Sequence, residues 1–287
     1  MKTPLTFTRG ADTADDLELM ARGALATGLF DFVAGGAGEE RTVAANRAGF
    51  GRLRLLPRVL RYVSAVDTST SIFGTDLAAP IFTYPMGGLA LLRSAGDLAF
   101  ARAAAAALVG MIAAVAGGAT IEDIAAAASG ARWLGLYWNA DPSITADFVA
   151  RAEAASYRAI VLTVDAPIRG TRRRIARSGF AMPPGAHLVN LERHAQPGVT
   201  PAPGGASIVA TGDRSLSWKD VEWLRSTTRL PVILKGIMTT EDAPPSRSAR
   251  KRAARWSRTM AGDSSTRCPA RSGSSSGLLM PSPGAFL

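Results

Sequence analysis

Five short apolar runs, separated by helix-like segments, constrain the fold of this chain more than any other feature of its sequence. They are PIFTY at 80–84, GMIAAV at 110–115, WLGLYW at 133–138, AIVLTV at 159–164 and PVILK at 231–235, each bounded by turn residues. A repeating strand–helix pattern requires a parallel sheet, because each crossover helix returns the chain to start the next strand beside the last. We therefore expect an α/β fold, either doubly wound or closed into a barrel.

Helical patterns fill the intervals between these runs and precede the first of them. They cover 95–108, 120–129, 143–156 and 217–227, and two further helices are expected over 13–28 and 38–49. Thr120 and Ser217 are the expected N-caps, since an aspartate follows each at the capping-box spacing. Residues 53–74 are expected to be extended with turns, and the Pro- and Gly-rich stretch 181–212 to form a long inserted loop.

Composition places the chain among globular proteins. Its 287 residues, 47% of them hydrophobic, suffice for a sizeable core in one large domain or two small ones. The alanine-rich run 101–108 is too short and too charged to span a bilayer, and the N-terminus has no secretory signal pattern, so we expect a cytoplasmic location. A single cysteine, Cys268, excludes an intramolecular disulfide, and only two histidines, His187 and His194, argue against a histidine-based metal site.

The formal net charge of +10 is concentrated at one end of the chain. Residues 244–287 hold eight basic side chains against one acid, which accounts for +7 of that charge. A basic surface attracts phosphate backbones, so a nucleic-acid or acidic-surface partner must be considered for this segment. The first 243 residues carry only the remaining +3 and give no such signal.

Polar and flexible residues gather where the apolar runs end. In a barrel, function lies at the C-terminal ends of the strands. These ends carry, or are followed closely by, Pro85-Met86-Gly87-Gly88, Tyr137, Thr163, Asp165, Arg169, Arg172 and Lys235. Hydroxyls, guanidinium groups and an ammonium on one rim suit an anionic substrate or cofactor. Structural interpretations remain open for some of them, since Asp165 could cap the next turn and Arg172 to Arg174 could form a solvated face.

The glycine clusters do not form a dinucleotide-binding fingerprint. GGAGEE at 35–40 follows a helix rather than a strand, which is the wrong context for a Rossmann motif. Gly117 and Gly118 follow the second apolar run and could approach a phosphate, but an ordinary strand-to-helix turn is favoured.

Four stretches carry a resemblance to a known family: FDFVAGGAGEERTVAANRAGF, RLLPRVL, LTVDAP and, most specifically, DRSLSWKDVEWLRSTTRLPVILKGIMTTEDA. Through them, residues 30–243 resemble the FMN-dependent 2-hydroxy-acid oxidases and dehydrogenases, the group of glycolate oxidase, flavin-linked L-lactate dehydrogenase and mandelate dehydrogenase. The resemblance implies a (β/α)8 TIM barrel with FMN across the strand ends. It also implies a small 2-hydroxy-acid substrate, oxidised to a 2-keto acid while flavin accepts two electrons, and it makes a homo-oligomer possible if the barrel is complete.

The resemblance assigns cofactor-binding roles to several residues. Pro85, Met86 and Gly87 match a loop that lies against the flavin ring, and Thr163 matches a flavin-binding threonine. Gly135 and Tyr137 match the ends of a Gln-Leu-Tyr that contacts flavin and substrate. Lys235 matches a lysine near the flavin N1 side, where a fixed cation stabilises the negative charge of reduced flavin.

The same resemblance assigns the substrate side to Tyr137, Arg172 and Phe32. Arg172 matches an arginine that pairs with the substrate carboxylate, whose two oxygens suit a guanidinium fork. Phe32 stands where the family usually has a substrate-binding tyrosine. Ala114 likewise replaces a serine, and Gly135 replaces the glutamine. Each replacement removes a hydrogen-bond partner and costs about 1 kcal/mol.

The sequence after Ala243 departs from the family altogether. A Ser-Asn-His-Gly-Gly-Arg-Gln-Leu-Asp motif, which supplies the catalytic histidine and a second carboxylate-binding arginine, is absent from PPSRSARKRAARWSRTMAGDSST and the residues beyond it. Bases that encode WSRTMAGDSST can, when grouped one base earlier, spell VVSNHGGRQLD. We therefore expect residues 1–243 to be an incomplete FMN-dependent dehydrogenase barrel, truncated after about the fifth strand, and residues 244–287 to be a basic, disordered, out-of-frame tail.

Loss of the last strands has predictable consequences. The sheet cannot close, so open edges and an exposed apolar interior are expected. With the base lost, no catalytic residue of that kind is retained, and this copy is expected to be inactive. The alternative is a non-enzymatic fragment whose basic tail binds nucleic acid or acidic surfaces.

Overall fold

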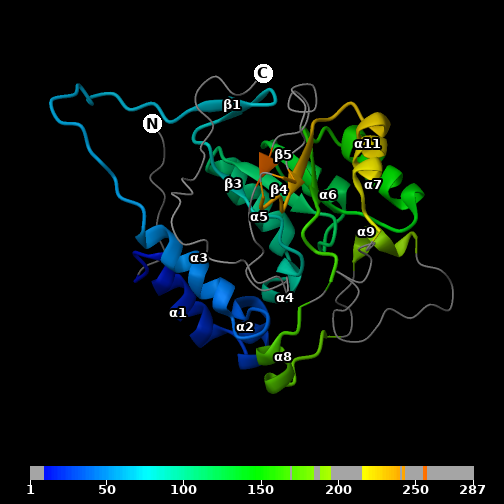
Figure 1. Cartoon of the computed structure of the whole chain (residues 1–287), viewed down its shortest axis with the longest axis horizontal. Helices are drawn as coiled ribbons and strands as arrows, with labels where there is room; N and C mark the ends of the chain where they lie inside the picture. The colour runs from blue at the N-terminus through cyan, green and yellow to red at the C-terminus, as the bar shows by residue number, and fades with distance from the viewer. Residues whose placement is uncertain are drawn as a thin grey trace.

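A curled parallel sheet with helices along its outer face forms the body of the protein (Figure 1). The computed structural model describes residues 10–168, 170–183, 188–194, 215–239, 241–242 and 255–256. The sheet contains β3 (Phe82–Thr83), β4 (Gly110–Ala114), β5 (Arg132–Tyr137), β6 (Ile160–Thr163), β7 (Val232–Lys235) and β8 (Arg255–Trp256). These strands pair in parallel and in sequence order, which is the arrangement of a barrel and not of a doubly wound sheet.

All five predicted strands are confirmed, and the register brings their C-terminal ends to one edge. Leu136 pairs with Leu162 and Tyr137 with Thr163, while Thr163 in turn pairs with Lys235. β8 was not predicted, and it falls within the segment expected to be a tail. The other residues of 243–287 lie outside the described residues.

The crossover helices agree closely with the sequence patterns. α5 (Gly96–Ala106), α6 (Ile121–Ala127), α7 (Pro142–Ala154) and α11 (Trp218–Thr227) each follow a strand or its connecting loop. Thr120 caps α6 by accepting the Asp123 backbone N–H, and at the start of α11 the Ser217 hydroxyl and backbone N–H both donate to the Asp220 carboxylate at 2.7 Å. The short helices α4 (Leu89–Leu92), α8 (Arg173–Ser178) and α9 (Val189–Glu192) were not predicted.

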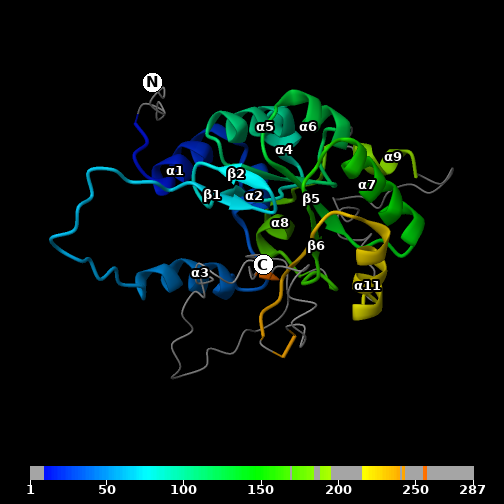
Figure 2. The same cartoon turned by 90° about the horizontal axis from the view of Figure 1, so that it is seen from above.

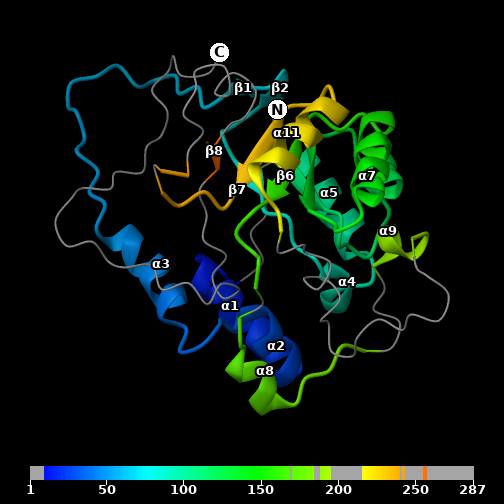
Figure 3. The same ribbon diagram turned by 45° about the vertical axis from the view of Figure 1, so that its right-hand side comes forward.

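The N-terminal helices differ in one respect from the prediction. The expected helix over 13–28 is two helices, α1 (Ala14–Ala24) and α2 (Thr27–Ala34), because the backbone is extended at Leu25 and remains non-helical at Ala26. The bend lets α2 bury Phe30 while α1 stays at the surface. α3 (Arg41–Gly51) follows, and α8 lies against α2 on the same side of the molecule (Figure 3).

Two apolar clusters lie on opposite faces of the sheet. The larger packs outward-facing residues such as Leu134, Leu136, Ile160 and Leu162 against α5, α6, α7 and α11. The smaller lies on the concave face and contains Ile112, Trp133, Ala159, Val161 and Ile233.

The expectation of an exposed apolar interior is wrong for the described residues. Each member of the concave cluster is at least 98% shielded from solvent. The antiparallel hairpin of β1 (Thr70–Ile72) and β2 (Thr75–Leu77) supplies part of the cover, since Ile72 and Phe73 pack on this cluster. The open edges are as expected, because β3 and β8 each have one neighbour in the described sheet.

Between α3 and β1 the chain forms an extended segment without helix or strand, residues 52–69, which we call the arm. It projects from the body and returns to it at the hairpin (Figure 2). Of the helices in the described part of the chain, none combines the length and apolar character needed to cross a bilayer.

Candidate functional site

A small cavity of about 30 Å³ lies where β3 to β7 end. It is lined by Tyr84, Pro85, Gly87, Ala114, Ala116, Gly135, Tyr137, Thr163 and Lys235. The sheet therefore brings six of the seven predicted cofactor-binding residues to one place, together with Ala114. Met86 does not line this cavity, and its side chain is 39% exposed.

Lys235 is the charged centre of this cavity. It is 2% exposed, and its Nζ lies 3.0 Å from Asp165 Oδ1 and 5.8 Å from the centre of the Tyr84 ring. A cation removed from water needs a nearby negative charge or a set of hydrogen-bond acceptors. Asp165 supplies that charge, so it pairs across the sheet with Lys235 in addition to any local role in its own turn.

The close approach of Asp165 to β7 requires a glycine. Gly236 has φ +116°, and a Cβ built on it would lie 2.4 Å from the Asp165 Cβ. A side chain at position 236 would therefore be strained and would displace Asp165 from Lys235.

Gly135 has a packing explanation that the sequence does not reveal. A Cβ at this position would lie 2.7 Å from the Pro85 Cβ and 3.2 Å from the Ala113 carbonyl oxygen. Pro85 thus occupies the room that a larger residue at 135 would need. The absence of a side chain here is coupled to the position of the Pro85 loop.

Arg172 and Phe32 lie together beside the strand ends. Arg172 Nη2 donates to the carbonyl oxygens of Phe32 at 2.5 Å and Gly35 at 2.6 Å, and the guanidinium lies 5.3 Å from the centre of the Phe32 ring. A Cβ at Gly88, in the loop after β3, would lie 4.0 Å from the same ring. The two residues predicted for the substrate side are therefore neighbours, and they adjoin the loop that lines the cavity.

The alternative of a solvated face for Arg172 to Arg174 is only partly correct. Arg172 is partly buried by its contacts with α2, and Arg174 pairs with Glu40 at 2.7 Å. Arg173 is the exposed member of the three.

The turn between β4 and α6 is held by a buried carboxylate that sequence reasoning missed. Asp97 in α5 is buried, and its Oδ2 accepts the Gly118 backbone N–H at 3.0 Å. Desolvation raises the pKa of the Asp97 carboxyl, an effect that the Gly118 hydrogen bond opposes. Asp97 already accepts the Gly118 N–H, so that amide is not available to a phosphate. Gly117 and Gly118 therefore form an ordinary strand-to-helix turn and not a phosphate-binding loop.

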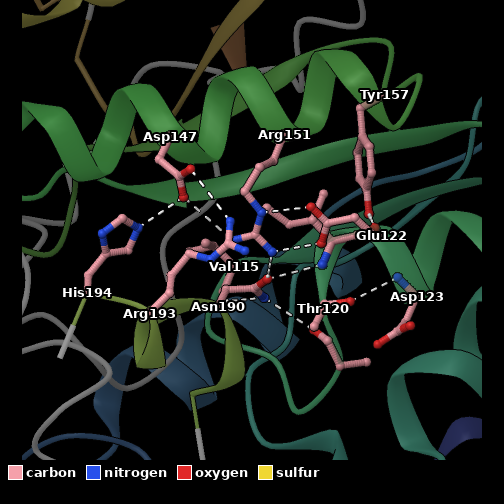
Figure 4. A network of polar contacts seen from close by, with 12 residues as sticks. Val115, Thr120, Glu122, Asp123, Asp147, Arg151, Tyr157, Asn190, Arg193 and His194 are labelled. Carbon is pink, nitrogen blue, oxygen red and sulfur yellow. Dashed lines mark hydrogen bonds and ion pairs between the residues drawn. The ribbon is translucent and has the colours of Figure 1, made fainter.

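Asn190 holds the same turn from the other side, as Figure 4 shows. It is 1% exposed, and its Nδ2 donates to the carbonyl oxygens of Val115 at 3.1 Å and Ala119 at 3.2 Å. Its Oδ1 accepts the Ile121 backbone N–H at 3.1 Å and Arg151 Nη2 at 2.8 Å. Val115 separates Ala114 from Ala116, both of which line the cavity, so Asn190 fixes one wall of the site.

Arg151 extends this network outward along α7. It donates to both carboxylate oxygens of Glu122 at 2.7 Å and lies 3.7 Å from Asp147. The hydrogen bond from Arg151 lowers the pKa of the Glu122 carboxyl to about 2. His194 belongs to the same network, with its Nε2 2.9 Å from Asp147 Oδ2. His187 lies outside the described residues, so the histidine that the structure does describe is engaged away from the cavity.

A second cavity, of about 310 Å³, adjoins the first and shares Tyr137 and Thr163 with it. Its walls include Trp138, Trp218, Ile237 and the acidic Asp242. The strand ends of β5 to β7 therefore face both spaces. Arg169, the remaining residue predicted at these ends, lies outside the described residues.

Comparison with known proteins gives a consistent result. The family model described as FMN-dependent dehydrogenase matches residues 21–251. An L-lactate oxidase of Alicycliphilus denitrificans is 41% identical over 236 residues, which are 82% of this chain and 65% of that protein. A peroxisomal (S)-2-hydroxyacid oxidase of Arabidopsis thaliana is 40% identical over 232 residues, which are 80% of this chain and 63% of that protein.

Solved structures agree in fold. A mandelate oxidase crystallised with (S)-2-phenylpropionate matches with a TM-score of 0.71 and 38% identity, over 82% of this chain and 64% of that one. A soluble mutant of the membrane-associated (S)-mandelate dehydrogenase from Pseudomonas putida matches with a TM-score of 0.71 and 30% identity, over 80% of this chain and 65% of that one. The chain thus spans slightly less than two thirds of the length of these relatives.

Proposed function

The chain belongs to the FMN-dependent dehydrogenase family, and we propose that its described body is the flavin-facing part of a 2-hydroxy-acid oxidoreductase. The observation that carries the proposal is the buried Lys235 at a strand-end cavity that it shares with Thr163 and Tyr137. A fixed cation beside hydroxyl groups is the environment that a cofactor needs if it becomes negatively charged on reduction.

The groups around the cavity fit the ring end of FMN by their chemistry. Lys235 would stabilise negative charge on the ring, the hydroxyls of Thr163 and Tyr137 would donate to it or accept from it, and the Pro85–Gly87 loop would lie against its face. When bound, FMN would supply the two-electron acceptor for the reaction. The cavity of about 30 Å³ must widen to admit a ring, and the adjoining space of about 310 Å³ provides room for that movement.

On the substrate side, Arg172 would hold the carboxylate of a 2-hydroxy acid, with Phe32 and Tyr137 beside it. Arg172, which precedes α8, is oriented by the carbonyl oxygens of Phe32 and Gly35, and these contacts hold it against α2. Phe32 offers an apolar ring in place of a hydroxyl. It would therefore contact the apolar side chain of the 2-hydroxy acid and not its carboxylate or hydroxyl group.

We further propose that this chain, as its sequence stands, does not turn over such substrates. Proton abstraction by a positioned base contributes about 10²–10⁴-fold to a rate. His194 is paired with Asp147 of α7, and the sequence after Ala243 contains no histidine. A reading-frame shift near codon 243 accounts for that loss, and it makes residues 244–287 a segment without a catalytic role.

The test compares the chain as it stands with a version whose frame is restored near codon 243. Each is titrated with FMN and assayed with lactate, glycolate and mandelate and an artificial electron acceptor. We expect the present chain to bind flavin weakly and to show no turnover above a no-protein control. The restored chain is expected to be yellow and active toward at least one of the acids. Turnover by the present chain would refute the loss of function, and a restored chain that binds FMN but oxidises none of a broad panel would refute the assigned reaction.

A second candidate function rests on the charge distribution alone. Residues 244–287 carry +7 of the net charge, which suits nucleic acid or another acidic surface. Retention on immobilised DNA that falls with added salt, and that disappears when the chain is ended at Ala243, would support this alternative. Equal elution of the full and shortened chains would exclude it.

A further inference from the structure

Arg172, the residue proposed to hold the substrate carboxylate, takes its direction from the turn that joins α2 to α3, residues 35–40. Its guanidinium donates to the carbonyl oxygens of Phe32, in α2, and of Gly35, the first residue of that turn. The Gly38 backbone N–H donates to the carbonyl oxygen of the residue before Arg172 at 2.8 Å. Figure 3 shows α8, which starts directly after Arg172, beside α2. A change in the shape of the turn would therefore redirect the guanidinium.

Glu40 closes the 35–40 turn at its far end. Its Oε1 accepts the Gly36 backbone N–H at 3.0 Å, and its Oε2 accepts Arg174 Nη2 at 2.7 Å. The backbone of Glu40 has φ +58°, a left-handed conformation that residues with a side chain seldom adopt. A glycine would relieve the strain but would supply no carboxylate. The position keeps a carboxylate at a conformational cost, which indicates that the carboxylate has a role there.

Arg174 connects Glu40 to the same residue that holds Arg172. A Cβ built on Gly35 would lie 3.3 Å from both the Cβ and the Cδ of Arg174, so the aliphatic part of Arg174 packs on Gly35. Arg174 Nη1 also lies 3.9 Å from Asp31 Oδ1. The side chains of Glu40 and Arg174 are 23% and 38% exposed, so water screens this ion pair less than it screens a fully exposed one.

We propose that Glu40 and Arg174 are positioning residues for Arg172. Their ion pair fixes the 35–40 turn against α8 and so aims the Arg172 guanidinium, while neither residue needs to touch the substrate. This inference rests on the proposed function, because it takes Arg172 as the group that binds the carboxylate of the 2-hydroxy acid.

The test variant is Glu40→Gln, which keeps an acceptor for the Gly36 N–H and removes the charge that Arg174 meets. The full chain is treated with phenylglyoxal in excess FMN, and modification of Arg172 is followed by peptide mass spectrometry at a temperature where every variant is folded. Arg172 should react slowly in the unmodified chain, because two carbonyl oxygens hold its guanidinium. Glu40→Gln should raise that rate by about fivefold.

The preceding residue provides a matched control. Glu39 pairs with Arg41 at 2.5 Å, and both side chains are exposed. Glu39→Gln removes the same charge from the same turn and should leave the reactivity of Arg172 unchanged. On the other side of the proposed pair, Arg174→Lys keeps the positive charge and should react more slowly at Arg172 than Arg174→Met does.

Lactate gives the measurement that a merely structural role would not move. It should protect Arg172 from phenylglyoxal in the unmodified chain, whereas its methyl ester, which has no carboxylate, should not. Glu40→Gln should raise the lactate concentration needed for half-protection by about fivefold. Glu39→Gln should not change it.

The positioning role is overturned if Arg172 reacts equally fast in Glu40→Gln and in the unmodified chain. A rise in Glu40→Gln that Glu39→Gln matches, or that all arginines share, would overturn it as well, since either result indicates general loosening. Absence of protection by lactate in the unmodified chain would contradict the proposed function instead, because the reactivity of Arg172 without lactate is measured independently.

Discussion

Asn190 offers the sharpest test of how the site is held in place. The substitution Asn190→Ala removes four hydrogen bonds from a side chain that is 1% exposed. Two of them hold carbonyl oxygens of the β4–α6 turn and one holds the first backbone N–H of α6. A buried polar group that loses its partner keeps the free-energy cost of desolvation without a compensating hydrogen bond. The loss of stability should therefore exceed that from losing exposed hydrogen bonds.

The expected magnitude follows from these contacts. Each buried hydrogen bond contributes about 1 kcal/mol net. Arg151 keeps Glu122 and Asp147 as partners, so its share is small, and the total is about 3 kcal/mol. For a domain of this size each kcal/mol shifts the unfolding midpoint by roughly 2–4 °C, which predicts a decrease of roughly 6–12 °C.

Thermal unfolding at pH 7, followed by circular dichroism, measures the effect. Asn46→Ala, at an exposed position on α3, is the matched control and should leave the midpoint unchanged. Asn190→Asp keeps the acceptor for the Ile121 N–H but sets a carboxylate against the carbonyl oxygens of Val115 and Ala119. It should therefore be at least as destabilising as alanine. If Asn190→Ala shifts the midpoint no more than Asn46→Ala does, the proposed support of the turn is wrong.

Three further predictions concern charge and packing around the site. Burial raises the pKa of Asp97 above its ordinary value, so the stability that it contributes is complete at low pH and declines as pH rises through the raised pKa. Asp97→Asn should accordingly raise the unfolding midpoint at pH 7 but not at pH 3.5, and an equal change at both would contradict this. Arg151 lowers the pKa of Glu122 from 4.5 to about 2, so its contribution is present above 4.5 and lost as pH falls to about 2. Glu122→Gln should flatten the dependence of the unfolding midpoint on pH in that window, and a curve parallel to the unmodified chain would refute the assignment. Gly135→Gln should lower stability without improving FMN affinity, because its Cβ would meet the Pro85 ring at 2.7 Å; a tighter flavin titration would show that the loop yields.

The parts of the fold that the sequence predicts are those with local signals. The five strands are apolar runs bounded by turn residues, and Thr120 and Ser217 begin helices with an aspartate three residues later. The strand-end residues Tyr137, Thr163 and Lys235 were placed together because parallel strands end at one edge, and the register confirms that they do.

The parts that the sequence does not predict depend on contacts between distant segments. Asn190 lies in a Pro- and Gly-rich stretch that indicates only a loop, yet it reaches Val115, 75 residues away. Asp97 looks like an ordinary acidic residue in the first turn of a helix, and its role is visible only once Gly118 lies beside it. The exposed interior was predicted from the missing strands, and it is wrong for the described residues, where Ile72 and Phe73 of the hairpin supply part of the cover over that face.

The order of the strands explains how the part of the fold that holds the site in place can form independently of the residues needed for catalysis. Each of β4 to β7 pairs with the strand that precedes it, and the outer cluster packs the sheet against helices from the same stretch of sequence. This part of the barrel therefore does not need closure to bury its outer core, and Asp97 and Asn190 hold the β4–α6 turn from within it. Under the proposed function, the phosphate end of the cofactor and the base that removes the substrate proton would lie at strand ends beyond β7, because barrels commonly hold phosphate in the loops after their last two strands. The proposed loss of function therefore predicts a folded outer core together with weak flavin binding and absent turnover.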